Sequence, residues 1–248
     1  SLSPSISAYS EGVNGSSTVK DLETLLQLNY LYFTAPRRDE ESYQTLMSIL
    51  DSQLANRDKN PKVAWSDSVQ MMASNYSDRT LIINKELLSK ASLDKALEVY
   101  KARFANPADF TFFFVGNVDP ADPAFQTMVC TWLGGLKANK KLEKAADDKV
   151  RVAMGIQKNY FTRQMETKTA SNRIQYTSYD MPYTLANDLN MEMIGRILST
   201  RYLESIRERE GGSYGVGCAG WMNRHPVPYA QLIMQFDTDP EKQEKLMN

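Results

Sequence analysis

The sequence RYLESIREREGGSYGVGCAGW, from Arg201 to Trp221, decides how the second half of this chain folds. The charged run Arg207 to Glu210 is followed by Gly211-Gly212 and then by strand-type residues from Ser213 onward. Glycine ends helices because it adopts the left-handed backbone conformation without a steric penalty. The stretch therefore predicts a helix that ends in the charged run, a two-glycine corner and a strand.

Arg207 and Tyr214 are the candidate functional residues of this stretch. Arg207 falls in the last helical turn, where the negative end of the helix dipole favours a cation. Tyr214 follows the two glycines, so the corner could bring a fixed positive charge and a phenol donor to the same side. A helix C-terminal cation and a packed aromatic ring would explain the same residues without any function.

The composition is that of a globular chain without a strong charge bias. Of its 248 residues, 24% are charged and 42% hydrophobic, which is typical of folded soluble proteins. Lys plus Arg number 29 and Asp plus Glu 30, and no apolar run is long enough to cross a bilayer. We therefore expect neither nucleic acid nor membrane as a partner. The sequence starts within a strand-like segment and stops within a helix begun at Pro240, so we expect a fragment truncated at both ends.

Capping residues and apolar spacing predict the elements of the first half. Thr18 and Asp21 form a capping-box-like start for one helix, Asp39 caps a second, and Asn60-Pro61 starts a third. The expected elements are a strand over residues 2–9, a loop over 12–17, and helices over 18–33, 39–54, from 60 onward and over 93–104.

The sequence DFTFFFVGNVDP, from Asp109 to Pro120, is a continuous apolar run of strand-favouring residues. Such a run is typical of a strand that is covered on both faces. A helix from Asp122 follows, and this order of elements favours α/β or α+β layers, of which we expect α+β. The charged segment that comes next has no apolar stripe, which predicts a linker. We predict related α+β domains over 1–138 and 151–248, joined by a linker over 139–150.

In the second half, strand-type residues occupy 160–165 and 173–179, and Thr184 caps a long helix. The alternating residues from Tyr229 to Asp237 are expected to pair with those from Ser213 to Trp221. The helix carries apolar residues at helical spacing: Leu185, Leu189, Met193, Ile197 and Leu198.

Two short motifs overlap in the glycine-rich stretch, and both stand in the wrong context. Gly211 to Gly215 fits G-x-S-x-G, with His225 nearby, but a nucleophile elbow joins a strand to a helix, whereas here a helix leads into a strand. Gly215 to Gly220 fits G-x-G-x-x-G, but a dinucleotide site needs a helix after it, and a turn follows. Small residues in a strand more often admit a closely packed backbone. A catalytic zinc needs about three protein ligands, and His225 is the only histidine.

Several segments, taken in order, resemble the pitrilysin/insulinase family of zinc peptidases, the inverzincins. The resemblance covers nearly the whole chain, and the segment R-E-x-E-G-G-x-Y-G-V, from Arg207 to Val216, is its most specific part. The other segments are LETLLQLNYLYFTAPRRDEESYQTLMSIL at 22–50, FTFFFVGNVDP at 110–120, WLGGL at 132–136, the charged linker, and YLESI at 202–206.

This resemblance implies a role for Arg207 and Tyr214. In active members, one half of a clamshell carries H-x-x-E-H and a distal glutamate, which hold zinc and its water, and the other half supplies an arginine and a tyrosine to the substrate. The matching positions here are Arg207 and Tyr214, whereas H-x-x-E-H is absent. The resemblance thus implies the non-metal, C-terminal half of a large member, with no zinc and no hydrolytic activity of its own.

We therefore expect the substrate-embracing half of a zinc-dependent metalloendopeptidase. Its partners would be a peptide substrate and the zinc-bearing N-terminal half of the same protein, and zinc would be the cofactor of the full-length enzyme. The resemblance also favours a soluble, bacterial extracytoplasmic protein. Two alternatives remain: a catalytically inactive structural relative of the same family, and a serine hydrolase that uses Ser213.

Overall fold

The structure, a computed structural model, describes residues 1–57, 59–164, 166, 168–213 and 215–247. The chain divides into two compact units, one formed by residues 1–56 and 83–145 and the other by residues 57–82 and 146–248. Each unit combines helices with a small antiparallel sheet, which confirms the expected α+β class. The division into related domains over 1–138 and 151–248 stays a prediction.

The first unit consists of a β-hairpin and a set of helices. Strand β1 pairs with β2 in antiparallel register from Leu2 opposite Gly15 to Ile6 opposite Glu11. The expectation of a loop over 12–17 was wrong, because β1 supplies the backbone partner that lets this polar segment form a strand. The elements are β1 (Leu2–Ile6), β2 (Glu11–Gly15), η1 (Val19–Asp21), α1 (Leu22–Thr34), α2 (Glu40–Arg57), α4 (Lys85–Ser89), α5 (Leu93–Arg103), η2 (Pro107–Asp109) and α6 (Pro123–Trp132).

The helices begin where their capping residues predict. The Thr18 hydroxyl accepts a hydrogen bond from the Asp21 backbone N–H at 3.3 Å, and the Asp39 carboxylate accepts one from Ser42 at 2.9 Å. The Asp122 carboxylate accepts one from the N–H of Ala124 at 2.9 Å. These bonds satisfy N–H groups that the first helical turn leaves without a partner.

Aromatic rings form the core of the first unit. Phe104 is only 2% exposed, and its ring stacks on Tyr100 with the centroids 4.4 Å apart. Phe33 from α1 and Phe110 contact each other edge to face at 4.9 Å, a favoured geometry for aromatic pairs. This cluster joins α1, α5 and the start of the Phe-rich run.

The predicted central strand over 109–120 was wrong. Among the described residues, no strand includes this segment, and Phe113 and Val115 are 85% and 99% exposed. A strand covered on both faces needs neighbouring strands to satisfy its backbone groups, and no described strand pairs with this run. The local composition therefore indicates an extended chain but does not by itself produce a sheet.

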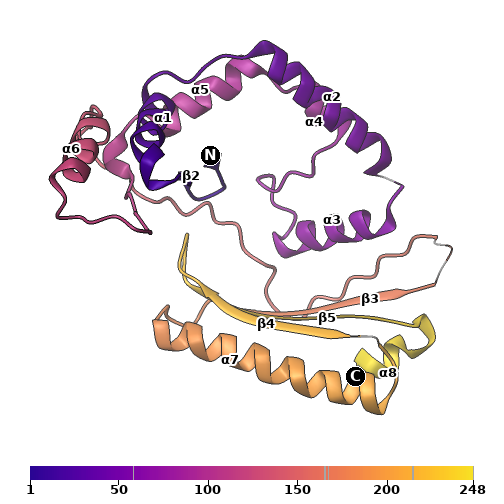
Figure 1. Cartoon of the computed structure of the whole chain (residues 1–248). Coiled ribbons are helices and arrows are strands. Elements are labelled where there is room, and N and C mark those ends of the chain that lie inside the picture. The colour runs from indigo at the N-terminus through magenta and orange to yellow at the C-terminus, as the bar shows by residue number, and fades with distance from the viewer. Residues whose placement is uncertain (58, 165, 167, 214, 248) are drawn as a thin grey trace. The chain divides into compact units, whose positions relative to one another are not determined.

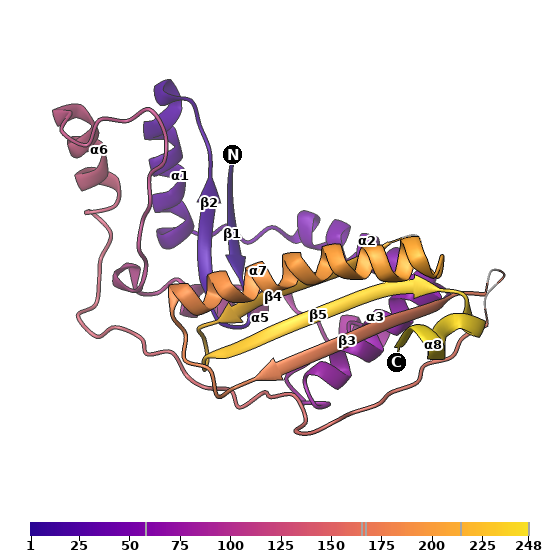
Figure 2. The same cartoon turned by 90° about the horizontal axis from the view of Figure 1, so that it is seen from below.

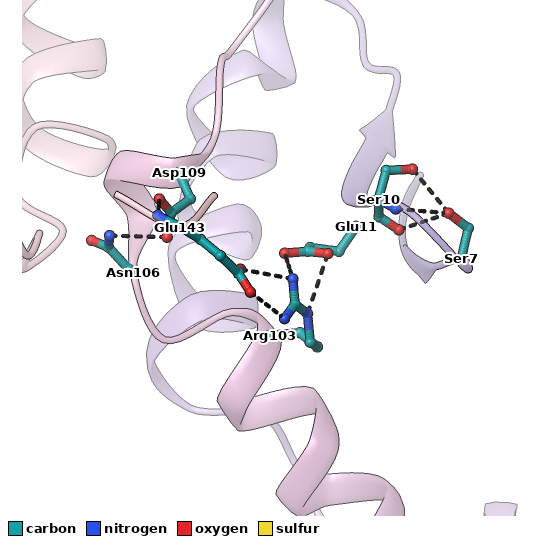
Figure 3. A network of polar contacts seen from close by, with 7 residues as sticks. All are labelled: Ser7, Ser10, Glu11, Arg103, Asn106, Asp109 and Glu143. Atoms are coloured by element: carbon teal, nitrogen blue, oxygen red, sulfur yellow. Dashed lines mark hydrogen bonds and ion pairs between the residues drawn. The ribbon is translucent and has the colours of Figure 1, made fainter. Parts of the chain in front are cut away.

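Arg103 fastens the expected linker to the first unit (Figure 3). Its guanidinium donates to both carboxylate oxygens of Glu11, at 2.8 and 3.3 Å, and to both of Glu143, at 2.8 Å each. The backbone N–H of Glu143 also donates to Asp109 at 2.7 Å. Ion pairs in which a guanidinium donates two hydrogen bonds to one carboxylate fix the relative orientation of the two groups, in addition to pairing their charges. The linker segment around Glu143 is thus held against α5.

The second unit is built on a three-stranded antiparallel sheet in the order β3-β5-β4 (Figure 2). The expected pairing of the two strands around the 224–228 bend is confirmed, whereas the strand expected over 160–165 was wrong, because residues 160–164 form no strand and Met165 lies outside the described residues. The elements are α3 (Pro61–Ala73), β3 (Ala170–Ser178), α7 (Leu185–Tyr202), the π-helical turn η3 (Leu203–Arg209), β4 (Val216–Asn223), β5 (Tyr229–Thr238), η4 (Pro240–Lys242) and α8 (Gln243–Met247).

Helix α7 lies along one face of this sheet and approaches β4 at backbone distance (Figure 1). A Cβ atom on Gly195 would lie 2.5 Å from the Gly220 nitrogen, and one on Gly220 would overlap the carbonyl oxygen of Met191. The Asp188 carboxylate accepts a hydrogen bond from the Met222 N–H at 2.8 Å. The apolar stripe expected on α7 does not form this contact with the sheet, since its first four members are half exposed or more: Leu185, Leu189, Met193 and Ile197.

We expect Gly220→Ala to lower the free energy of unfolding by about 1–3 kcal/mol, because the added methyl group separates α7 from β4. Denaturant-induced unfolding measures this loss. Gly217→Ala is the matched control in the same strand, where an added Cβ meets nothing within 4 Å, and it should change stability by no more than about 0.5 kcal/mol. Equal effects of the two substitutions would contradict the proposed close contact.

We also expect Arg103→Met to release the linker segment. The substitution removes the cation shared by Glu11 and Glu143, and amide hydrogen exchange at Glu143 should rise about tenfold. Arg38→Met is the control, because Arg38 pairs with Asp94 on the exposed surface of the same unit. Unchanged exchange at Glu143 in Arg103→Met would show that Arg103 does not hold this segment.

Candidate functional site

The two-glycine corner joins η3 to β4 and carries the predicted functional residues. Helix α7 continues as a π-helical turn, a form that is often found at functional sites. The Gly211 N–H donates to the Arg207 carbonyl at 3.1 Å, and the Gly212 N–H donates to the Ile206 carbonyl at 2.9 Å. These bonds satisfy carbonyls that the end of a helix leaves open. The predicted helix stop at the glycines is confirmed.

The two glycines are required for different physical reasons. Gly211 has a φ of +52°, in the left-handed region that other residues adopt at a cost. Gly212 is buried, and a Cβ atom there would lie 2.5 Å from Cδ1 of Leu246. The buried Thr238 hydroxyl donates a hydrogen bond to the Gly212 carbonyl. Gly211 therefore allows the chain to turn, and Gly212 leaves room for the side chain of Leu246 in α8.

The C-terminal segment holds the corner from outside. Lys245 of α8 forms an ion pair with Glu210, and this hydrogen bond, followed by the positive charges of Lys245 and Lys242, lowers the pKa of Glu210. The Lys242 ammonium donates to the Gly211 carbonyl at 3.3 Å. The corner thus receives contacts on both sides of its turn.

Arg207 is exposed and follows directly after Ile206, which is buried in a small cluster with Val216 and Phe236. Among the described residues, no carboxylate lies within 4 Å of its guanidinium. Tyr214 lies outside the described residues. The pairing of Arg207 with Tyr214 therefore stays a prediction, with Arg207 anchored by its buried neighbour and open to a ligand.

Strand β4 separates the residues of the serine-hydrolase alternative. Ser213 precedes this strand and donates through its hydroxyl to the Gly215 carbonyl at 2.8 Å, whereas the exposed His225 follows the far end. A strand of eight residues is about 26 Å long. The structure does not bring Ser213 and His225 together.

The G-x-G-x-x-G motif from Gly215 to Gly220 lies almost entirely within β4, which continues to Asn223, so the turn expected directly after the motif was wrong and the bend lies at residues 225–227. Its last glycine faces the backbone of α7 at Met191. Close packing is thus confirmed at Gly220, whereas a Cβ atom on Gly215 or Gly217 would meet nothing within 4 Å. The described part of the chain also contains no group of three or more His, Cys, Asp or Glu residues placed to hold a metal ion, so its donor set does not fit a zinc site. No described helix is long and apolar enough to span a membrane.

A polar set that was not predicted from the sequence lies on the sheet face opposite α7. The odd-numbered positions of β3 are polar throughout, and their partners on β5 include Gln235 and Asp237. The alternation within β3 was visible in the sequence, but the cross-strand neighbours depend on the register. The β3 members of this set are Ser171, Arg173, Gln175 and Thr177.

Comparison with known protein families shows which family the sequence matches. The model of a family described as "Peptidase M16 inactive domain" matches residues 90–248. A zinc protease PQQL-like from Arabidopsis thaliana is 25% identical over 92% of this chain, and the probable zinc protease PqqL of Escherichia coli is 22% identical over 99%. The chain spans about a quarter of the length of these curated relatives, 25% and 26% respectively.

Solved structures share the fold. The periplasmic protease PqqL from Escherichia coli matches all of this chain with a TM-score of 0.83 and 18% identity, over 27% of its own length. The ferredoxin protease FusC, solved in complex with Arabidopsis ferredoxin, matches all of the chain with a TM-score of 0.74 and 16% identity, over 26% of its own length. The first half of PqqL alone matches 92% of the chain with a TM-score of 0.56 and 13% identity, over 49% of its own length.

We expect Gly211→Ala to destabilise the corner by about 1–2 kcal/mol, because alanine resists the left-handed conformation. Gly211→Asn should lose less stability than Gly211→Ala, since asparagine tolerates the left-handed conformation better. Denaturant-induced unfolding provides the measurement, and Gly215→Ala, with open space around an added Cβ, is the control. The conformational explanation is rejected if Gly211→Asn and Gly211→Ala are equally destabilised.

Proposed function

Because this chain belongs to the peptidase M16 family through its inactive domain, we propose that it is the substrate-embracing, non-metal half of a zinc-dependent metalloendopeptidase. The relatives' names as zinc proteases support zinc as the cofactor of the full-length protein. The donor set of the described residues does not fit that metal, so the proposal assigns its ligands to another part of the longer protein. The chain alone is then inactive.

The proposed role of Arg207 and Tyr214 is to stabilise negative charge on the substrate. Peptide hydrolysis places negative charge on the carbonyl oxygen of the attacked bond, and preorganised donors lower the energy of that state. An exposed guanidinium without a carboxylate partner, on a turn held by buried contacts, is suited to this task. A phenol O–H from Tyr214 would supply a second donor. Neither residue generates the nucleophile.

We infer that the partners are a peptide substrate and the metal-bearing half of the same protein. Two comparisons support this inference: FusC was solved with a protein bound to it, and the first half of PqqL contains a region of the same fold. Because PqqL is described as periplasmic, we also infer an extracytoplasmic location.

Tyr214→Phe in the full-length protein tests the catalytic role. Loss of one donor to the developing oxyanion should lower kcat about 10²–10³-fold and leave KM nearly unchanged. Steady-state hydrolysis of a quenched fluorescent peptide measures both constants, with Tyr160→Phe at an exposed tyrosine as the control. Unchanged kcat would reject the role of Tyr214. A zinc-loaded wild-type protein without turnover would instead favour the catalytically inactive relative.

A further inference from the structure

Arg173 is a half-buried cation without a counter-charge. One terminal nitrogen donates to the Gln175 side-chain oxygen at 3.0 Å, and the other donates to that of Gln235 at 3.5 Å. Its Nε atom is buried and has no hydrogen-bond partner. Among the described residues, no carboxylate lies within 4 Å of it. Burial lowers the pKa of Arg173.

This arrangement is costly unless a ligand compensates it. Burying part of a charge without an opposite charge is unfavourable, and neutral amide oxygens orient a guanidinium without neutralising it. Each terminal nitrogen of Arg173 carries two N–H groups, and each uses one on a glutamine. One N–H group therefore remains on each terminal nitrogen, and each can donate to a carboxylate oxygen.

Asp237, the acidic residue nearest to Arg173 along the sheet, already has other partners. Asp237 on β5 lies opposite Ser171, accepts a hydrogen bond from its hydroxyl at 2.6 Å, and lies 3.9 Å from the Lys62 ammonium. Beyond Ser171 there is a hollow of about 280 Å³ whose described lining contains Lys62, Arg163 and Lys168 and no acidic residue. Positive charge thus prevails at this end of β3.

We propose that Arg173 binds a carboxylate of an extended peptide that lies on the sheet face opposite α7, so that the protein favours substrates with an acidic side chain. This inference rests on the proposed peptide-binding function and adds a substrate class to it. Gln175 and Gln235 act as positioning residues, because they set the direction of the guanidinium. The cationic hollow favours further negative charge on the same peptide.

Binding to the full-length protein tests the proposal. The probes are fluorescein-labelled peptide pools with one Glu at each position in turn, and matched pools with Gln instead, read by stopped-flow anisotropy before turnover. Wild-type protein should bind the Glu pool about tenfold more tightly than the Gln pool. Arg173→Gln should abolish this preference, whereas Arg196→Gln, on the exposed surface of α7, should retain it.

Gln235→Glu provides a second variant that keeps Arg173 in place. The new carboxylate lies within reach of the guanidinium and competes with the peptide, so the preference for Glu should disappear while the melting temperature is kept or raised. A preference that survives in both Arg173→Gln and Gln235→Glu would overturn the assignment. Equal wild-type binding of the two pools would overturn it and leave the proposed function intact, whereas binding of neither pool would overturn both.

Discussion

The close approach of α7 to β4 is the constraint on which the second unit depends. At Gly195 and Gly220 the helix and the strand meet with no room for a side chain, and Asp188 accepts a hydrogen bond from the β4 backbone nearby. This contact decides which face of α7 meets the sheet. It also determines where the chain leaves the helix, and therefore where η3 carries Arg207. The corner is tied to this framework through Ile206, which packs with Val216 at the start of β4.

The same contact gives the sheet two different faces. The face toward α7 contains most of the buried apolar residues of the sheet, such as Phe236 and Met222, whereas the opposite face carries the buried Ile233 together with Arg173 and the glutamines that it contacts. The first four members of the expected apolar stripe of α7 stay half exposed or more, whereas Gly195 is buried and Met191 and Leu198 are half-buried. The helix thus meets the sheet on the side that contains Gly195, where the backbones can approach each other.

The sequence predicted helices better than strands for a physical reason. A capping residue such as Asp39 or Asp122 satisfies N–H groups within its own turn, so the signal and the structure are local. The run at Phe110 to Pro120 has strand composition but no described strand beside it, and pairing depends on residues far away in sequence. The helix stop at the corner was predictable because Gly211 supplies the positive φ locally, whereas the need for Gly212 depends on Leu246 in α8. The environment of Arg173 was not, since it depends on the register of β3 with β5.

A shared physical feature connects the corner with the polar sheet face. Arg207 and Arg173 both lack a carboxylate within 4 Å in the described part of the chain, although acidic residues are as frequent as basic ones in the sequence. Other arginines here find such partners, as Arg103 does twice and Arg57 does with Asp67. Arg163, Arg201, Arg209 and Arg224 also have no such partner among the described residues. Arg173 differs from them because its Nε atom is buried, and Arg207 because it directly follows the buried Ile206. Under the proposed function, the guanidinium groups of Arg207 at the corner and Arg173 on the sheet are the features of this chain that contact the peptide.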